Sequence, residues 1–370
     1  MEFGILIHGF NPRHPHDNVR EHDWIRREIE LVQEADRCGF KYVWLTEHHF
    51  LEEYSHLSAS EVFIPWLGAV TKRIHVGSGI WNLNPEVNHP ARIAERAALL
   101  DHLMDRRFEF GSGRGAGSYE VGGFGIEDTG ATKAVWEEVI WEFRKMWEET
   151  CYSHAGQAFS MPPRNVLPKP YQPGHPPMWM AAGNVASYER AALHGLGVLG
   201  FNIANCEAMR APVGAYKQAI KQAKPVGAYV HDNVMVATRM FLHESSERAK
   251  EIATEIGISY LDSLIYRYHD TFPRPDEWPQ WPQTAPEPTA DDVQERIDQG
   301  FMLCGNVDEV TQQTQAYAEI GCDQVVFGYP FDLDHQDALH SIRLYGEHII
   351  PKFDRDPVHR STRCREGTLA

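Results

Sequence analysis

The chain has 370 residues, of which 42% are apolar, and a formal net charge of −17. This acidity, without any run of five Lys or Arg residues, argues against a nucleic-acid partner, because a phosphate backbone would repel the protein. The six cysteines lack C-x-x-C spacing, so neither a zinc site nor a disulfide framework is indicated. We find no basic leader and no stretch of 18 apolar residues, and therefore expect a cytoplasmic protein without a membrane span.

Predicted strands and helices alternate along the whole chain. Residues 3–8 and 42–47 form the first two predicted strands, and between them apolar residues recur at helical spacing over 25–35. Prolines between 162 and 177 predict an irregular connection. The remaining predicted strands cover 74–80, 107–112, 178–181, 198–202, 233–242 and 324–328, and helical patterns cover 58–71, 93–104 and 135–146.

About eight strand–helix units without a clear linker predict one domain, 1–370, folded as a parallel (β/α)8 barrel of the TIM type. The segment 266–288 is too rich in proline for regular structure and too aromatic for a plain linker. It predicts an insertion at about 266–300 on the C-terminal face of the barrel. We interpret it as a mobile lid; a packed surface excursion or a dimer contact is the alternative.

Two histidines follow the second predicted strand. His48 and His49 are neighbours, and neighbouring strand residues point to opposite faces, so both cannot bind one ion. One of them facing the cavity could donate or accept a proton near neutral pH, and a structural, hydrogen-bonded histidine is the alternative. The N-terminal cluster of His8, His14, His16 and His22 lacks organised carboxylates, and we expect no metal site.

A glycine-rich loop at 111–117 follows the fourth predicted strand. It satisfies G-x-G-x-x-G/A, but the opening helix and later acidic residue of a dinucleotide site are missing. Arg114 in such a loop could instead bind a phosphate, or the loop is a plain turn with a surface arginine. After the fifth strand, Asn184 or Ser187 could cap a helix whose free N–H groups attract an anion.

Several of these segments together resemble the bacterial luciferase-like flavin-dependent monooxygenases. The similarity covers most of the chain except about 205–300. The matching stretches are FGILI at 3–7, GFKYVWLTEHHF at 39–50, residues 74–114 with HPARIAERAALLDHL and RRFEFGSGRG, residues 176–192, and residues 304–326 with CGNVDEVTQQ and GCDQVV.

The resemblance implies an enzyme that uses reduced FMN and O2 to oxygenate a small organic substrate. It implies that a separate flavin reductase supplies the reduced flavin, and we expect a homodimer. His48 matches the histidine that assists formation or breakdown of the flavin peroxide. The implied cofactor-binding residues are Arg114, Ala182, Gly183, Asn184 and Ser187 around the phosphate, and Gly79 and Ile80, joined by a non-proline cis peptide, behind the isoalloxazine ring.

Three departures from the luciferase large subunit argue against light emission. That subunit has a cysteine where this chain has Gly113, an acidic residue and a serine where this chain has Gly183 and Asn184, and a shorter loop than 81–88. Oxygen activation belongs to the cofactor and is compatible with these changes. The alternatives are a hydride-transfer enzyme that uses an 8-hydroxy-5-deazaflavin, and a non-catalytic flavin-binding partner subunit.

Overall fold

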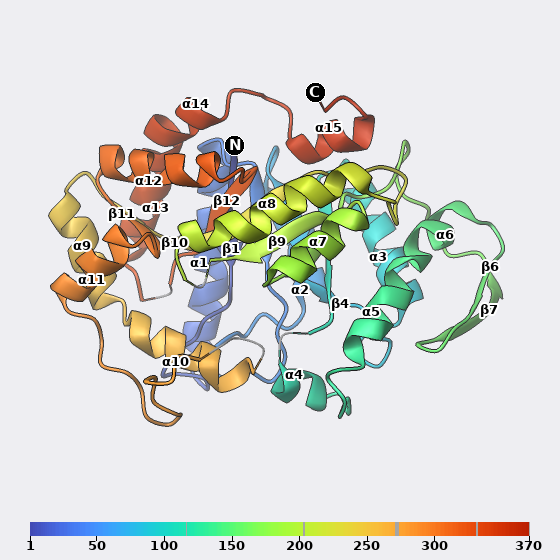
Figure 1. The fold of residues 1–370 in the computed structure, drawn as a ribbon, viewed down its shortest axis with the longest axis horizontal. Helices are drawn as coiled ribbons and strands as arrows, with labels where there is room; N and C mark the ends of the chain where they lie inside the picture. Colours follow the sequence, from blue (N-terminus) through green and yellow to red (C-terminus); the bar gives the residue numbers. More distant parts are fainter. Residues whose placement is uncertain (116, 203, 271–273, 331, 370) are drawn as a thin grey trace.

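The computed structural model describes residues 1–115, 117–202, 204–270, 274–330 and 332–369. Within this part of the chain, eight parallel strands pair in a closed ring, and helices surround them (Figure 1). The predicted (β/α)8 barrel is therefore confirmed. The ring consists of β1 (Glu2–Ile7), β2 (Tyr42–Leu45), β3 (His75–Ser78), β5 (Phe108–Gly113), β8 (Met178–Ala182), β9 (Gly197–Phe201), β10 (Val234–Leu242) and β12 (Gln324–Phe327).

Four further strands were not predicted. The strand β4 (Trp81–Asn82) pairs with the end of β5, and β11 (Met302–Gly305) pairs with the second half of β10. The hairpin of β6 (Tyr152–Ala155) and β7 (Ser160–Arg164) projects from the barrel at the right of Figure 1. Our prediction of an irregular connection from residue 162 onward was wrong for the end of β7, because prolines are tolerated in an edge strand.

Several helices around the ring begin at a residue whose side chain caps them, among them α1, α7 and α12. Asp17 accepts hydrogen bonds from the amides of Val19 and Arg20 at the start of α1. The helix bounds are α1 Asn18–Arg37, α2 Ser60–Val70, α3 Pro90–Leu103, α4 Ser118–Gly122, α5 Thr132–Ile140, α6 Glu142–Glu148, α7 Val185–Leu193, α8 Arg210–Ala219, α9 Ser246–Glu255, α10 Ile258–Tyr268, α11 Ala290–Asp298, α12 Val307–Glu319, α13 His335–Leu344, α14 Ile350–Phe353 and α15 Arg360–Glu366. None of the helices described here is long and apolar enough to span a membrane.

Large aromatic side chains fill the inside of the barrel. Trp44 is fully buried, and its indole N–H donates to Gln324 Oε1 at 2.6 Å. A Cβ at Gly77 would lie 2.3 Å from the Trp44 ring, so only glycine leaves room for the indole there. The interior cluster comprises Tyr42, Trp44, Trp179, Leu199, Met235, Ala237 and Val326.

The C-terminal helix α15 closes the N-terminal end of the barrel, at the top of Figure 1. Arg365 binds Asp101 through two hydrogen bonds of 2.7 and 2.8 Å, and both side chains are almost fully buried. Breaking such a pair costs about 3–5 kcal/mol. Ser361 and His75 contact Glu109 at 2.5 and 2.7 Å, and burial raises the pKa of Glu109 to about 7. Buried, paired side chains thus fill this end of the barrel. The helices α4 and α10 lie at the opposite end of the molecule (Figure 1).

The predicted insertion lies beside the opposite end. Residues 266–268 belong to α10, so this part of the segment is regular, contrary to prediction. Residues 274–289 contain neither helix nor strand, and α11 follows. Residues 271–273 of the predicted lid lie outside the described residues. Its opening and closing stay a prediction.

Candidate active site

Three histidines and a tyrosine gather at the C-terminal ends of β1 and β2. The ring of Tyr54 lies 4.5 Å from that of His8, 5.4 Å from that of His48 and 4.7 Å from that of His269, measured between centroids. His8 and His48 are 5.6 Å apart. Burial, with smaller contributions from His48 and His269, lowers the pKa of His8 well below its ordinary value. His8 is therefore neutral at neutral pH.

A buried carboxylate holds His48. Glu120, on α4, is 4% exposed, and its Oε2 lies 3.2 Å from His48 Nδ1. Its other oxygen accepts the backbone N–H of His49 at 3.2 Å. A carboxylate accepts hydrogen bonds and cannot donate them, so Nδ1 carries the proton. In the neutral imidazole this leaves Nε2 as the acceptor on the far side of the ring.

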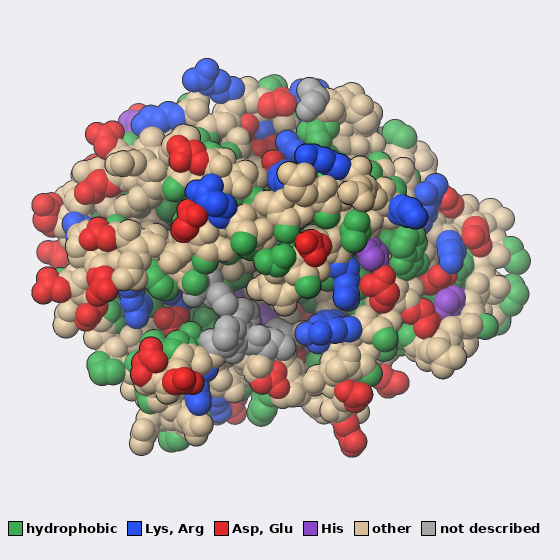
Figure 2. All heavy atoms as spheres, viewed as in Figure 1, with side chains coloured by type: hydrophobic (Ala, Val, Ile, Leu, Met, Phe, Trp, Pro, Cys, Tyr) green, Lys and Arg blue, Asp and Glu red, His purple; other side chains and the backbone are tan. Residues whose placement is uncertain are grey.

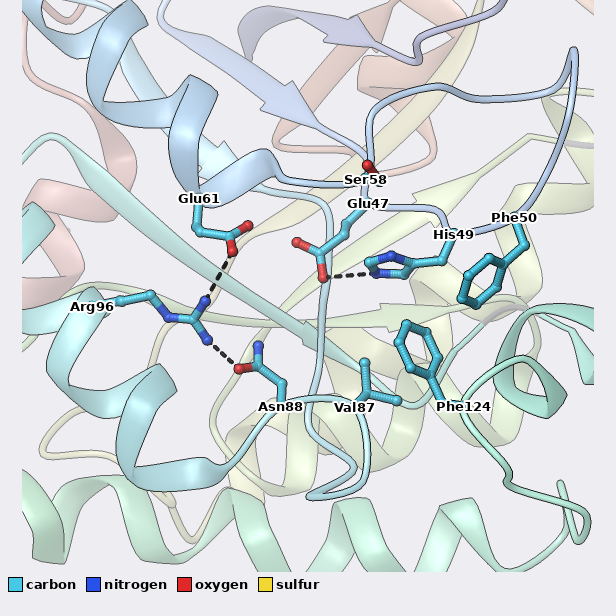
Figure 3. A pocket seen from close by; sticks show the side chains of 9 residues that line it. All are labelled: Glu47, His49, Phe50, Ser58, Glu61, Val87, Asn88, Arg96 and Phe124. Atoms are coloured by element: carbon cyan, nitrogen blue, oxygen red, sulfur yellow. Dashed lines mark hydrogen bonds and ion pairs between the residues drawn. The ribbon is translucent and has the colours of Figure 1, made fainter. Parts of the chain in front are cut away.

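His49 points to a separate cavity of about 450 Å³, shown in Figure 3. Its Nε2 lies 3.5 Å from Glu47 Oε1, and its ring meets that of Phe124 edge-on. Burial opposes the charged imidazole, but the carboxylates of Glu47, Glu120 and Glu61 together raise the pKa of His49, Glu47 most strongly. Arg96 pairs with Glu61 across the same cavity. The two neighbouring histidines thus diverge, but strand alternation is not the cause, because β2 ends at Leu45 and both histidines lie in the loop that follows.

Arg114 follows β5 on the same rim. Its Nη1 donates to Thr132 Oγ1 at 3.0 Å and to Thr129 O at 3.4 Å. No carboxylate pairs with it among the described residues, so several guanidinium donors stay available. Gly115 has a φ of +91°, and a Cβ there would lie 2.5 Å from Val121. The loop therefore needs glycine at this position to bring its backbone close to α4.

The start of α7 lies at the end of β8, which neighbours β5. Asn184 and Ser187 form a capping box: Asn184 Oδ1 accepts from the Ser187 amide at 3.0 Å, and Ser187 Oγ accepts from the Asn184 amide at 3.1 Å. Ser187 Oγ also accepts from the Gly183 amide at 3.2 Å. The predicted cap is present. The positive end of the helix dipole, next to Ala182, therefore faces the rim that carries Arg114.

The end of β3 lies between these groups and His48. The Gly79–Ile80 peptide bond is cis, as the resemblance implies. The Gly79 amide donates to Leu45 O at 2.6 Å, which ties this turn to β2. A Cβ at Gly113 would lie 2.6 Å from Ile80 Cδ1. The Ile80 side chain thus occupies the space that a cysteine at position 113 would need.

Sequence reasoning did not find Glu120, Tyr54 or His269. Glu120 is 72 residues from His48 on a five-residue helix, where no periodic pattern marks it. Tyr54 and His269 lie in stretches without helix or strand. His8 was noted only as part of the N-terminal cluster. Across the described ranges, no group of three His, Cys, Asp or Glu residues could hold a metal ion.

The sequence is similar to proteins of a known family. The chain matches the family described as luciferase-like monooxygenase over residues 1–324. It is 23% identical over 371 aligned residues to the oxygenase component of flavin-dependent trigonelline monooxygenase from Acinetobacter baylyi, covering 97% of this chain and 98% of that protein. It is 28% identical over 269 residues to the alkanal monooxygenase alpha chain of Photorhabdus luminescens, covering 72% and 70%.

Solved structures share the fold. Monooxygenase RslO1 from Streptomyces bottropensis has a TM-score of 0.79 at 21% identity, covering 96% of this chain and all of that one. The oxygenating constituent of 3,6-diketocamphane monooxygenase from Pseudomonas putida, in complex with FMN, has a TM-score of 0.75 at 19% identity, covering 95% and 98%. An F420-dependent secondary alcohol dehydrogenase has a TM-score of 0.70 at 15% identity, covering 96% and 99%.

The contact between Glu120 and His48 predicts a tautomer. In wild-type protein, neutral His48 should carry its proton on Nδ1, because Glu120 accepts from that atom. In Glu120→Ala the signal should move toward the Nε2-protonated form. Nitrogen-15 NMR of the imidazole measures this change without any assay of activity. Glu127→Ala, which removes an exposed carboxylate of the same loop region, is the matched control. An unchanged tautomer in Glu120→Ala contradicts the assignment.

Proposed function

Because the chain belongs to the luciferase-like monooxygenase family, we propose that it is the oxygenase component of a two-component flavin monooxygenase. It uses reduced FMN and O2 to place one oxygen atom on a small organic substrate. One observation carries the proposal: a histidine held by a buried carboxylate shares a barrel rim with an arginine that lacks a carboxylate partner among the described residues. In barrels of this type, chemistry takes place at this rim.

The residues present fit a phosphate group. Arg114 keeps free donors after its bonds to Thr129 and Thr132. The start of α7 adds the positive end of a helix dipole, with the amides of Val185 and Ala186 outside the capping bonds. We propose that Arg114, Ala182, Gly183, Asn184 and Ser187 hold the phosphate, and that Gly79 and Ile80 lie behind the ring system. When bound, the reduced flavin supplies the electrons that activate O2.

The proposed role of His48 is to hold or move a proton at Nε2. Glu120 fixes the ring by accepting from Nδ1, so the second nitrogen faces away from the carboxylate. His8 stays neutral because of its lowered pKa and adds no competing charge. Tyr54 is 6% exposed and, with His8, excludes water from one side of the imidazole. Exclusion of water limits the loss of activated oxygen to side reactions.

We propose that a separate reductase delivers the flavin. The trigonelline relative is named an oxygenase component, which supports this division. Likeness to an F420-dependent dehydrogenase favours one alternative, hydride transfer with a deazaflavin. Anaerobic titration with reduced FMN, followed by mixing with oxygen, separates the two: FMN-dependent oxygen uptake with a long-lived absorbance transient supports the monooxygenase.

The cysteines of this chain are unpaired, which fits a cytoplasmic enzyme.

Arg114→Ala should weaken binding of FMN far more than binding of riboflavin, because only FMN carries the phosphate. A charge-assisted hydrogen bond of about 1.5–3 kcal/mol corresponds to roughly ten- to a hundredfold in Kd. Fluorescence titration of both flavins measures the difference. Arg92→Ala, at a largely exposed arginine of α3, is the control and should change neither value. An equal loss of affinity for FMN and riboflavin would show that Arg114 does not bind the phosphate.

His48→Ala should leave binding of oxidised FMN within a few fold, because His48 acts on a proton and does not anchor the cofactor. Product formation should fall by about 100-fold or more, the typical contribution of a placed proton-transfer group. Hydrogen peroxide should replace product, since reduced flavin reacts with oxygen unaided. The assay compares oxygen used with product formed from a panel of ketones, aldehydes and phenols. His49→Ala is the control; a larger loss there would transfer the role to His49.

We further propose that the chain forms a homodimer through α2 and α3. Five apolar side chains at helical spacing are exposed on these neighbouring helices, with Val62 68% and Leu103 64% exposed. Burying such a face in a second copy would remove it from water. The Glu61–Arg96 pair joins the two helices at 3.1 Å and keeps the face continuous. The exposed apolar residues are Val62, Trp66, Val70, Leu99 and Leu103.

Trp66→Glu should convert the dimer to a monomer, because it places a charge at the centre of an apolar interface. Sedimentation velocity at micromolar concentration gives the mass directly. Val19→Glu introduces the same charge at an exposed valine of α1 and should leave the dimer intact. A monomeric wild-type protein, or a Trp66→Glu variant that stays dimeric, contradicts the proposed interface.

A further inference from the structure

A second cavity, of about 620 Å³, lies beyond the ends of β9 and β10. One wall consists of α10, another of α11, and residues from the 275–288 segment cover the space between them. The residues that follow β9, including Asn202, form its floor together with Arg239 of β10. The cavity therefore opens on the same end of the barrel as His48, although no site residue assigned above lines it.

Two arginines of this cavity share one carboxylate. Arg239 Nη2 contacts Asp262 Oδ1, and Arg296 Nη1 lies 4.0 Å from Asp262 Oδ2. Arg239 makes this single hydrogen bond, and Arg296 makes none, within the part of the chain that the structure describes. Each guanidinium has five N–H donors. Asp262 is therefore the one carboxylate that forms an ion pair with them among the described residues, and most of their donors make no hydrogen bond.

The other acidic residues of the cavity are engaged elsewhere. Asp292 accepts hydrogen bonds from the amide and hydroxyl of Thr289, both at 2.7 Å, in the cap of α11. Glu295 accepts from Gln299 at 2.8 Å, one turn along the same helix. Both side chains belong to exposed residues, on the side of the molecule where acidic groups gather at the left of Figure 2. Neither carboxylate forms an ion pair with Arg239 or Arg296 among the described residues, although the Arg296 charge adds to the hydrogen bonds from Thr289 that lower the pKa of Asp292.

The remaining walls suit a planar, apolar body. Tyr266 and Trp278 meet edge-on at 5.4 Å, and Trp278 donates to Ser263 Oγ at 3.3 Å, which fixes the indole against α10. Phe201 and Phe301 line the opposite side. Aromatic walls with a few placed polar groups are typical of small-molecule sites, and a guanidinium recognises a carboxylate through two parallel hydrogen bonds.

This cavity communicates electrostatically with the histidine cluster. Burial raises the pKa of Tyr54, and Glu120, Arg239 and Asp262 act on it with smaller strength, Arg239 in the lowering direction. The Tyr54 ring in turn lies 5.4 Å from His48. Helix α10 joins the two regions: its Asp262 and Tyr266 line the cavity, and the ring of its Tyr268 lies 6.3 Å from that of Tyr54.

We propose that this cavity binds a small aromatic carboxylic acid, with Arg239 and Arg296 holding the carboxylate and the four aromatic residues holding the ring. The proposal rests on the proposed monooxygenase function, because it identifies this acid as the class of substrate to be oxygenated. Asp262 occupies the arginines in the free protein and competes with the ligand. Its removal should therefore strengthen binding of an acid, whereas removal of either arginine should weaken it.

The test measures binding by isothermal titration calorimetry without flavin, with benzoate, phenylacetate and 3-phenylpropanoate and the primary amide of each. Wild-type protein should bind at least one acid about tenfold more tightly than its amide, as a charge-assisted contact requires. Arg239→Met and Arg296→Met should reduce this preference to about twofold or less. Asp262→Asn should tighten binding of the acid by about threefold or more, a gain that a misfolded variant cannot produce.

Arg267→Met is the matched control, because Arg267 lies on α10 but outside the cavity and pairs with Glu52; it should keep the wild-type preference. Three outcomes would overturn the proposal. The amides could bind as tightly as the acids, none of the three acids could bind, or the preference for the acid could survive both Arg→Met changes. FMN titration of the same proteins is a separate readout. If wild-type protein does not bind FMN, the proposed function is wrong. The preference for acid over amide tests the cavity independently of FMN binding.

Discussion

The parallel pairing of β1 with β12 is the contact on which the rest of the structure depends. It joins Glu2 to Gln324 and Ile5 to Phe327, two segments more than 300 residues apart in sequence, and closes the ring of strands. Closure leaves the ring with no free edge. It also brings all eight carboxyl ends to one rim, so that the loops after β1, β2, β3, β5, β8, β9 and β10 can contribute to one site. The Trp44–Gln324 hydrogen bond crosses the interior and ties β2 to β12.

The two ends of this barrel are chemically different. At the N-terminal end, the charges are paired and buried: Arg365 holds Asp101, and Ser361, His75 and Trp179 all contact Glu109. Groups satisfied in this way stabilise the fold and are not available to a ligand. At the C-terminal rim, Arg114 lacks a carboxylate partner within the described ranges, and two arginines share Asp262. The unused guanidinium donors at this rim support our proposal that it is the binding face.

The glycine loop shows how small steric changes separate members of one fold. The luciferase large subunit has a cysteine where this chain has Gly113, and the Ile80 side chain fills that space here. Position 113 thus lies against Ile80, a member of the cis Gly79–Ile80 peptide. Different side chains on a common barrel framework are how one fold supports different substrates.

The sequence by itself determined the barrel, the position of His48, and the cap at Asn184 and Ser187, because these depend on local periodicity and on the residues that begin a helix. His48 and His49 do point apart as predicted, but they lie in the loop after β2, so the loop path and not strand alternation separates them. The sequence did not predict β4, whose two residues are too few for a pattern, or β11, which lies outside the ring and pairs only with the second half of β10. Only the tertiary structure placed Glu120 against His48, and Arg239 and Arg296 around Asp262. These contacts join side chains from loops and helices that no common period relates, and chain closure alone brings them within bonding distance.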